Sequence, residues 1–176
     1  VVWSSDAAAP GAYEIVGQAI SAEGQLVGAV QRYSDMGTND SDATFDAVTP
    51  DIAWHPGLGS FVVVWAGDDD TGGLLDGGFE LYGQLVNGAT GSETGANDFR
   101  ISYAGPDANS NDATNPAIAI TDDPTRWFVA FEGDITDDGI HDPEIFIYGG
   151  TGDIPDPGAF LVSQMGTGFN DGMSAR

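Results

Sequence analysis

Two segments of the sequence concentrate carboxylates at spacings that suit a hard cation. The first covers residues 66–80 and reads AGDDDTGGLLDGGFE, and the second covers residues 132–144 and reads EGDITDDGIHDPE. Calcium takes about six to eight oxygen ligands, which clustered aspartates, a nearby glutamate and backbone carbonyls can supply. We therefore predict two calcium sites, with side-chain ligands Asp68, Asp70, Asp76 and Glu80 in the first and Asp134, Asp137, Asp138, Asp142 and Glu144 in the second.

A third segment offers oxygen ligands in a looser pattern. Asp107, Asn109 and Asn111 stand two residues apart, as the first ligands of an EF-hand do. Glycine is missing at the sixth position and Ile118 stands where the bidentate glutamate belongs, so the segment is not an EF-hand. We carry the three residues as further candidate calcium ligands. The alternative for all these segments is a solvated, Asx-rich turn without an ion.

Other chemistries find less support in the sequence. His55 and His141, both expected in loops, have no second histidine or cysteine at ligand spacing, which argues against zinc. The chain has no G-x-S-x-G nucleophile motif. A carboxylate pair for glycoside hydrolysis cannot be singled out among 28 acidic residues. We expect a protein that is not an enzyme.

The charge restricts the partners. There are 28 acidic residues against 4 basic ones, a net charge of −24, which repels nucleic acid and anionic membranes. Of the acids, 22 are aspartate and 6 are glutamate, and aspartate favours turns and ion-binding loops. Adaptation to a saline habitat is the alternative cause. Cysteine is absent, and no apolar run or leader predicts membrane insertion or targeting in the chain as given.

The candidate ligands belong to a repeat. Shifting the chain by 66 residues places YEIVGQ (13–18) on FELYGQ (79–84) and FVVVW (61–65) on WFVAF (127–131). A third copy of the first phrase begins at PEIFIY (143–148). A Ser-x-x-Gly landmark also occurs three times, in RYSDMG, RISYAG and LVSQMG. Self-similarity at a fixed period predicts a repeat architecture.

Each repeat holds four short β-rich runs separated by turn formers. Where the repeat is best preserved these runs are 61–65, 79–86, 98–103 and 115–121. Their composition predicts an all-β chain built from four-stranded antiparallel units that resemble the blades of a β-propeller, with a β-sandwich as the alternative. We expect Trp65, Phe131 and Ile118 to be buried at equivalent positions of successive units.

The expected units cover residues 1–65, which start in mid-unit, 66–131, and 132–176, which are incomplete. Eleven strands are expected, where three whole blades need about twelve. An unpaired strand edge invites pairing with another chain. We therefore expect either self-association or completion by a longer parent chain. The tryptophans Trp3, Trp54, Trp65 and Trp127 are expected in the core.

The repeated pieces FVVVWAGDDDTGGLLDGGFELYGQ, NDFRIS and DATNPAIAI resemble tandem units of very large secreted and surface proteins of bacteria. The third unit departs from the pattern, because PEIFIYGGTGDIPDPGAF lacks the Gly-Gln pair. Units of this family serve as spacers, adhesive surfaces and assembly modules. The resemblance implies an extracellular, secreted or cell-surface module.

Together these features lead us to expect a non-enzymatic, calcium-binding β-repeat module. Its role would be structural, adhesive or self-assembling, at the cell surface or in a filament. Surface glycans are candidate partners. The alternative is a carbohydrate-binding, lectin-like propeller or a piece of a glycosidase.

Overall fold

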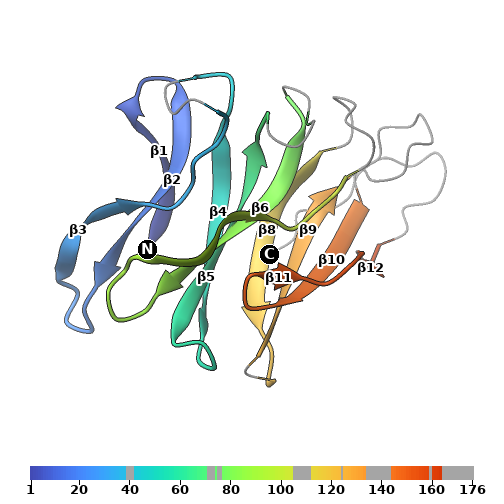
Figure 1. Cartoon of the computed structure of the whole chain (residues 1–176). Coiled ribbons are helices and arrows are strands. Elements are labelled where there is room, and N and C mark those ends of the chain that lie inside the picture. The colour runs from blue at the N-terminus through green and yellow to red at the C-terminus, as the bar shows by residue number, and fades with distance from the viewer. Residues whose placement is uncertain are drawn as a thin grey trace.

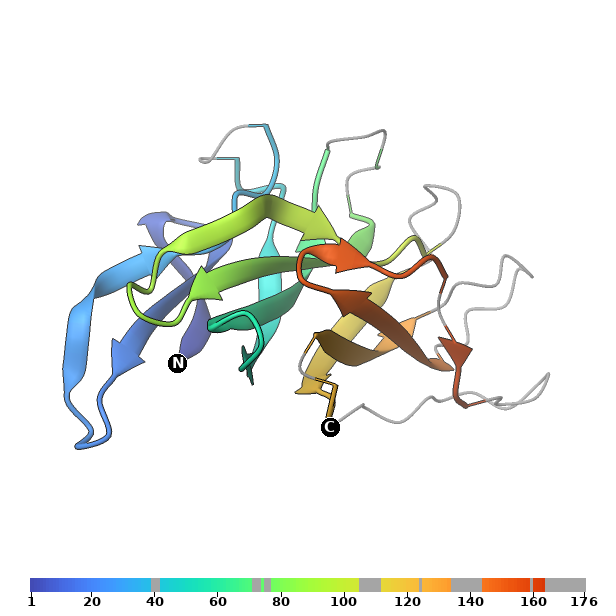
Figure 2. The ribbon, with the colours of Figure 1, turned by 60° about the horizontal axis from the view of Figure 1, so that its bottom comes forward.

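The computed structural model describes residues 1–38, 42–70, 74, 77–104, 112–123, 125–133, 144–158 and 160–163. All regular structure in these ranges is β-strand. The strands form three antiparallel sheets, which Figures 1 and 2 show following one another along the molecule. The prediction of an all-β chain with repeated antiparallel sheets is confirmed.

We name the sheets A, B and C in chain order. Sheet A contains β1 (Val2–Ala9), β2 (Ala12–Ile20) and β3 (Leu26–Arg32) in that spatial order. Sheet B contains β4 (Ala47–His55), β5 (Ser60–Asp68), β6 (Phe79–Asn87) and β7 (Glu93–Arg100). Sheet C contains β8 (Ala113–Ile120), β9 (Arg126–Gly133), β10 (Glu144–Thr151), and the short strands β11 (Ile154–Pro155) and β12 (Phe160–Leu161), both paired with β10.

Sheets B and C follow the same plan. In each, consecutive strands pair antiparallel, and the first strand carries a bulge in which a non-glycine residue has positive φ. These residues are Thr49 at 50° and Asn115 at 52°, which are 66 positions apart. The sequence period is therefore also a period of the backbone. The predicted unit boundaries at 65/66 and 131/132 fall within β5 and β9, so the middle unit contributes strands to two sheets.

Each sheet has two distinct faces, which we name after sheet B. The Trp face carries Trp3 in sheet A, Trp65 in sheet B and Phe131 in sheet C. Each of these residues lies opposite the residue two places after the repeated glutamate, respectively Val16, Tyr82 and Phe146. The opposite side, named the Val face, carries Ile15 in sheet A, Val64 and Leu81 in sheet B, and Ile147 in sheet C.

The sheets pack Val face to Trp face. Ile15 of sheet A lies in one core cluster with Trp65 and Tyr82 of sheet B. Val64 and Leu81, on the other face of sheet B, lie in a second cluster with Phe131 of sheet C. Both faces of sheet B are therefore buried. Its strand β5 accordingly reads as a continuous apolar run rather than an alternating one.

The close approach of sheets A and B depends on glycine. A Cβ at Gly67 would lie 2.5 Å from the Met36 sulfur and 2.9 Å from the Tyr82 ring. A larger residue would therefore displace the Met36 and Tyr82 side chains that pack between the sheets.

Several predictions of detail are corrected. Trp65, Trp127 and Phe131 are fully buried as expected, whereas Ile118, also expected to be buried, is only partly buried. Trp3 is 37% and Trp54 47% exposed. Trp3 is exposed because no described sheet covers the Trp face of sheet A, and Trp54 because it lies near the end of β4. The expectation that both are core residues is wrong.

Other differences concern the strands themselves. His55 ends strand β4 and is buried, so the expectation of a loop histidine is wrong. The third predicted run of the middle unit, 98–103, overlaps β7 only in part, because the chain leaves the sheet after Arg100. The described residues contain twelve strands rather than eleven, since β11 was not expected.

Candidate functional site

The repeated glutamate is the centre of a buried polar cluster in sheet B. Glu80, the second residue of β6, is buried and accepts a hydrogen bond from the Ser102 hydroxyl. It also accepts from Arg100 Nη2 at 2.7 Å and from the Ala104 backbone N–H at 2.8 Å. The Ser102 oxygen in turn accepts from the Leu81 N–H at 2.8 Å. We call this arrangement the Glu–Ser clasp.

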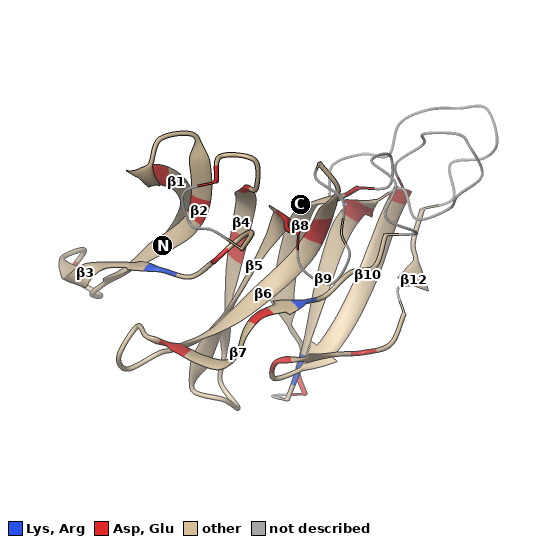
Figure 3. Cartoon of the chain, turned by 45° about the horizontal axis from the view of Figure 1, so that its top comes forward, with Lys and Arg blue, Asp and Glu red and all other residues tan. Residues whose placement is uncertain are grey.

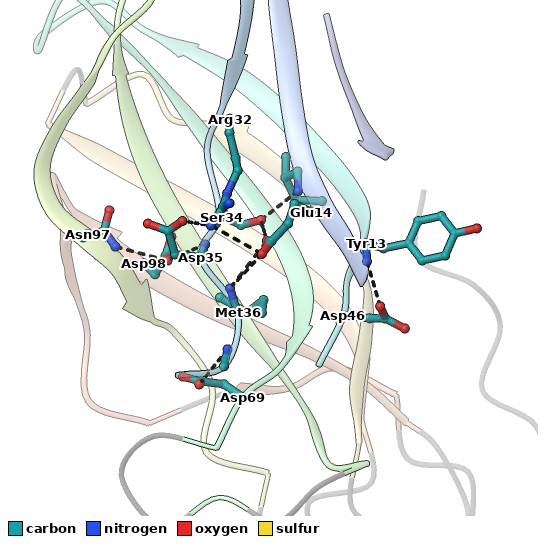
Figure 4. A network of polar contacts seen from close by, with 12 residues as sticks. Tyr13, Glu14, Arg32, Ser34, Asp35, Met36, Asp46, Asp69, Asn97 and Asp98 are labelled. Carbon is teal, nitrogen blue, oxygen red and sulfur yellow. Dashed lines mark hydrogen bonds and ion pairs between the residues drawn. The ribbon is translucent and has the colours of Figure 1, made fainter. Parts of the chain in front are cut away.

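Sheet A contains the same clasp, which Figure 4 shows from close by. Glu14 accepts a hydrogen bond from the Ser34 hydroxyl and from the Met36 N–H at 3.3 Å. Arg32 Nη2 lies 3.6 Å from the Glu14 carboxylate. The Ser34 oxygen accepts from the Ile15 N–H at 2.7 Å. The two sheets thus use equivalent residues for equivalent contacts.

Sheet C keeps part of the clasp. Glu144 is buried, and the Ile145 N–H donates to the Ser163 hydroxyl oxygen at 2.8 Å. Leu161 stands where the other sheets have arginine. The Ser-x-x-Gly landmark and the repeated glutamate are therefore two halves of one structural device. In sheets A and B, the clasp holds the segment that follows the last strand, β3 or β7, against the end of the sheet.

The repeated Gly-Gln pair also has a structural role. Ladder register shifts at Gly17/Ala19 in β2 and at Gly83/Leu85 in β6, so the glutamine occupies the irregular position in both strands. Gln84 Nε2 donates to the Thr94 carbonyl at 3.0 Å, and its Oε1 accepts from the Asp98 N–H at 3.1 Å. The side chain thus supplies ladder bonds that the bulge interrupts.

Aspartates in the connections tie one sheet to the next. Asp46, just before β4, accepts from the Tyr13 N–H of sheet A at 2.9 Å. Asp112, 66 residues later, accepts from the Phe79 N–H of sheet B at 3.0 Å. Asp51 Oδ2 reaches from β4 to the Ile118 N–H of β8 at 2.8 Å. Part of the aspartate excess therefore serves backbone capping between sheets.

Several acidic residues lie toward one end of the sheets, as Figure 3 shows for β2, β9 and β10. The register explains the gathering, because Glu80 lies opposite Gly67 at the end of β5, and Glu144 lies opposite Gly133 at the end of β9. Sequence reasoning predicted carboxylates at this end. It did not predict that the side chains of the repeated glutamates point inward and form the clasps.

Four of the predicted calcium ligands, Asp68, Asp70, Glu80 and Glu144, lie in the described residues. Glu80 and Glu144 belong to clasps in sheets B and C. The other eight lie outside the described residues: Asp76, Asp107, Asn109, Asn111, Asp134, Asp137, Asp138 and Asp142. Within the described part of the chain, no group of three or more His, Asp or Glu side chains is placed to hold a metal ion. The calcium sites therefore stay predictions.

Three consecutive aspartates follow β5 and lead into the predicted loop. Asp68 accepts from the Gly77 N–H at 2.9 Å, and Asp69 accepts from the Gly37 N–H of the neighbouring segment at 3.2 Å. Asp70 Oδ2 accepts from the Thr38 hydroxyl at 3.1 Å. Its Oδ1 is shielded from solvent and accepts no hydrogen bond from the residues described. A cation bound beside this oxygen would supply the partner that a buried carboxylate oxygen needs.

A polar cavity of about 440 Å³ lies between sheets A and B, beside these aspartates. Asp35 comes from the segment after β3, Tyr82 from β6 and Arg100 from β7. The cavity lining is Asp35, Asp69, Leu74, Tyr82, Asn97, Asp98, Arg100 and Tyr103. The Arg100 guanidinium stacks 4.3 Å from the Tyr103 ring centre. Burial, followed by the Asp69 charge, raises the pKa of Tyr82.

Asp98 is the most perturbed carboxyl in this cavity. Burial, followed by the charges of Glu93, Glu14 and Asp69, raises the pKa of Asp98 to about 7 against the opposing effect of Arg32. Asp98 Oδ2 accepts from the Asp35 N–H at 2.9 Å, which joins sheet A to sheet B. The residue has positive φ, 43°, a conformation that aspartate and asparagine tolerate better than most residues.

No helix long and apolar enough to cross a bilayer occurs among the described residues. Comparisons of the chain with protein-family models, with curated proteins and with solved structures found no match.

Proposed function

We propose that the chain is a non-enzymatic, extracellular β-repeat module with a structural, adhesive or self-assembling role at a cell surface or in a filament. The observation that carries the proposal is the use of the repeated polar residues. Glu14 and Glu80 form matching buried clasps with Ser34 and Ser102, inside the chain. Residues repeated for architecture rather than for a single reaction centre are typical of modules that extend a surface.

The sheets are blade-like in this proposal. Sheet B is a four-stranded meander, and β8, β9, β10 and β12 pair in the same order in sheet C. The face-to-face, same-direction packing of successive sheets fits propeller blades, whose number grows by repetition. A β-sandwich, the alternative, consists of two sheets packed face to face. It does not account for a third sheet that packs Val face to Trp face in the same direction.

Calcium binding is part of the proposal and is supported by one described atom in particular. Asp70 Oδ1, directly after Asp68 and Asp69, is buried and accepts no hydrogen bond from the described part of the chain. Three adjacent carboxylates repel each other unless they are protonated or neutralised by a cation. A calcium ion beside Asp70 would stabilise the folded chain.

A display experiment tests the adhesive role. Non-adherent bacteria that display the chain are expected to adhere to surfaces or to each other more than cells that display a scrambled chain of equal composition. Equal adherence of the two displays would contradict the proposal. Hydrolysis of any member of a polysaccharide panel by the purified chain would contradict the non-enzymatic part.

A carbohydrate-binding role is the second candidate, and exposed Trp54 favours it. Its ring lies edge-on to Phe61, with centroids 4.9 Å apart, and is 47% exposed. A Cβ at Gly88 would meet this ring at 2.4 Å, so glycine there keeps the ring in place. Exposed aromatic rings stack on sugars through their apolar faces. A glycan array separates the candidates: binding that Trp54→Ala abolishes would favour the lectin.

A further inference from the structure

The outer faces of sheets A and C are copies of faces that are buried inside the molecule. Trp3 of sheet A is the equivalent of Trp65, and the two differ in burial, at 37% and 0% exposed. At the other end of the molecule, Phe128 and Ala130 of β9 stand 66 residues after Val62 and Val64 of β5. Phe128 is 38% exposed, whereas both valines are fully buried.

The two outer faces are of opposite kinds. Sheet A shows its Trp face, with Trp3 and half-buried Val16 side by side across β1 and β2. Sheet C shows its Val face, with Phe128 and half-buried Ile147 on β9 and β10. Within the molecule, a Val face meets a Trp face twice, between A and B and between B and C. A third contact of the same kind needs the outer face of A and the outer face of C.

We propose that the Trp face of sheet A docks on the Val face of sheet C in a second copy of this chain. This inference rests on the proposed self-assembling role and names its partner and its two surfaces. The contact continues the packing already present between successive sheets. It is heterologous, because each copy offers one surface of each kind, so it leads to a closed ring or to an open filament.

Charge decides the conditions of the association. Each copy carries a net charge of −24, so copies repel one another at low ionic strength. In 1 M NaCl the screening length falls to about 3 Å, and apolar contact is then favoured. Association that strengthens with salt is expected for docking of apolar faces between two acidic molecules.

The test is sedimentation velocity at about 1–100 µM chain in 1 M NaCl. The wild type is expected to shift from monomer to larger species as concentration rises. Trp3→Glu and Phe128→Glu, each with one charged face, are expected to remain monomeric alone. Because each variant keeps the opposite face intact, an equimolar mixture is expected to form one-to-one dimers and nothing larger. Dimers in the mixture also show that both variants are folded.

Trp54→Glu is the matched control, since it charges an exposed tryptophan of the middle sheet. It is expected to associate like the wild type. A wild type that stays monomeric at 100 µM overturns the inference, and so does association of Trp3→Glu alone or loss of association in Trp54→Glu. Adhesion of displayed cells that survives in Trp3→Glu would retain the proposed adhesive role while the docking fails.

Discussion

The Ser102→Ala substitution probes the Glu–Ser clasp directly. The fully buried Ser102 hydroxyl donates to Glu80 and accepts from the Leu81 N–H. A hydrogen bond to a charged group contributes about 1.5–3 kcal/mol, and a buried donor left without a partner costs about 1–3 kcal/mol. Removing the Ser102 oxygen deletes the hydrogen bond to Glu80 and leaves the Leu81 N–H without its acceptor. We therefore expect the free energy of unfolding to fall by about 3 kcal/mol or more.

The control is Ser60→Ala. Ser60 is also buried, but its hydroxyl makes one long hydrogen bond, 3.4 Å to the Leu58 carbonyl. We expect this change to cost less than about 1 kcal/mol. Thermal unfolding followed by circular dichroism measures both variants. For a domain of this size, about 3 kcal/mol corresponds to a melting temperature lower by about 6–12 °C. If Ser102→Ala melts within about 2 °C of Ser60→Ala, the clasp does not hold the sheet end.

Three other predictions follow from the structure. Because the folded pKa of Asp98, about 7, lies above its ordinary value of 3.8, the folded state binds this proton more tightly, and stability falls as pH rises from about 4 to 7. Asp98→Asn should reduce this slope in urea unfolding series across that range, and an unchanged slope would refute the assignment. In the same assay, Trp65→Ala should lower the free energy of unfolding by about 3–5 kcal/mol. Trp3→Ala, measured in dilute monomer, should lower it clearly less, and equal losses would show that the two faces do not differ in burial. Millimolar calcium should raise the melting temperature more than NaCl of equal ionic strength does. At a hundredfold excess of calcium over Kd, the free energy of unfolding should rise by about 2.7 kcal/mol. Asp70→Asn should reduce this gain. Equal effects of the two salts would leave only charge screening.

The period of the sequence predicted the sheets well, because strand composition and turn residues are local properties. It also located Trp65 and Phe131 in the core, since each is the last residue of an apolar run, 61–65 and 127–131. The prediction that Trp3 is buried was wrong for a physical reason. Its local sequence matches that of Trp65, but burial depends on whether another sheet covers it, and no local pattern encodes that.

The clasp shows a different limit. Its two halves, the glutamate and the Ser-x-x-Gly landmark, were each visible as repeats about twenty residues apart. Their similar separation was a signal that the residues meet, since Glu80 and Ser102 are 22 positions apart and Glu14 and Ser34 are 20. Reading every acid near an aspartate cluster as a calcium ligand hid this signal. A glutamate flanked by strand residues is better placed to turn inward than an aspartate in a turn.

The aspartates before β4 and β8 have a consequence for the order in which the chain acquires its structure. Tyr13 and Phe79 each donate a backbone hydrogen bond to an aspartate 33 residues later, at the start of the following sheet. A polypeptide that emerges from a ribosome or a secretion pore with its N-terminus first cannot complete these bonds until the next stretch has followed. Sheets A and B are thus completed only after the start of the next sheet has emerged. Native structure therefore forms progressively along the chain, from the N-terminus onward, as the chain emerges.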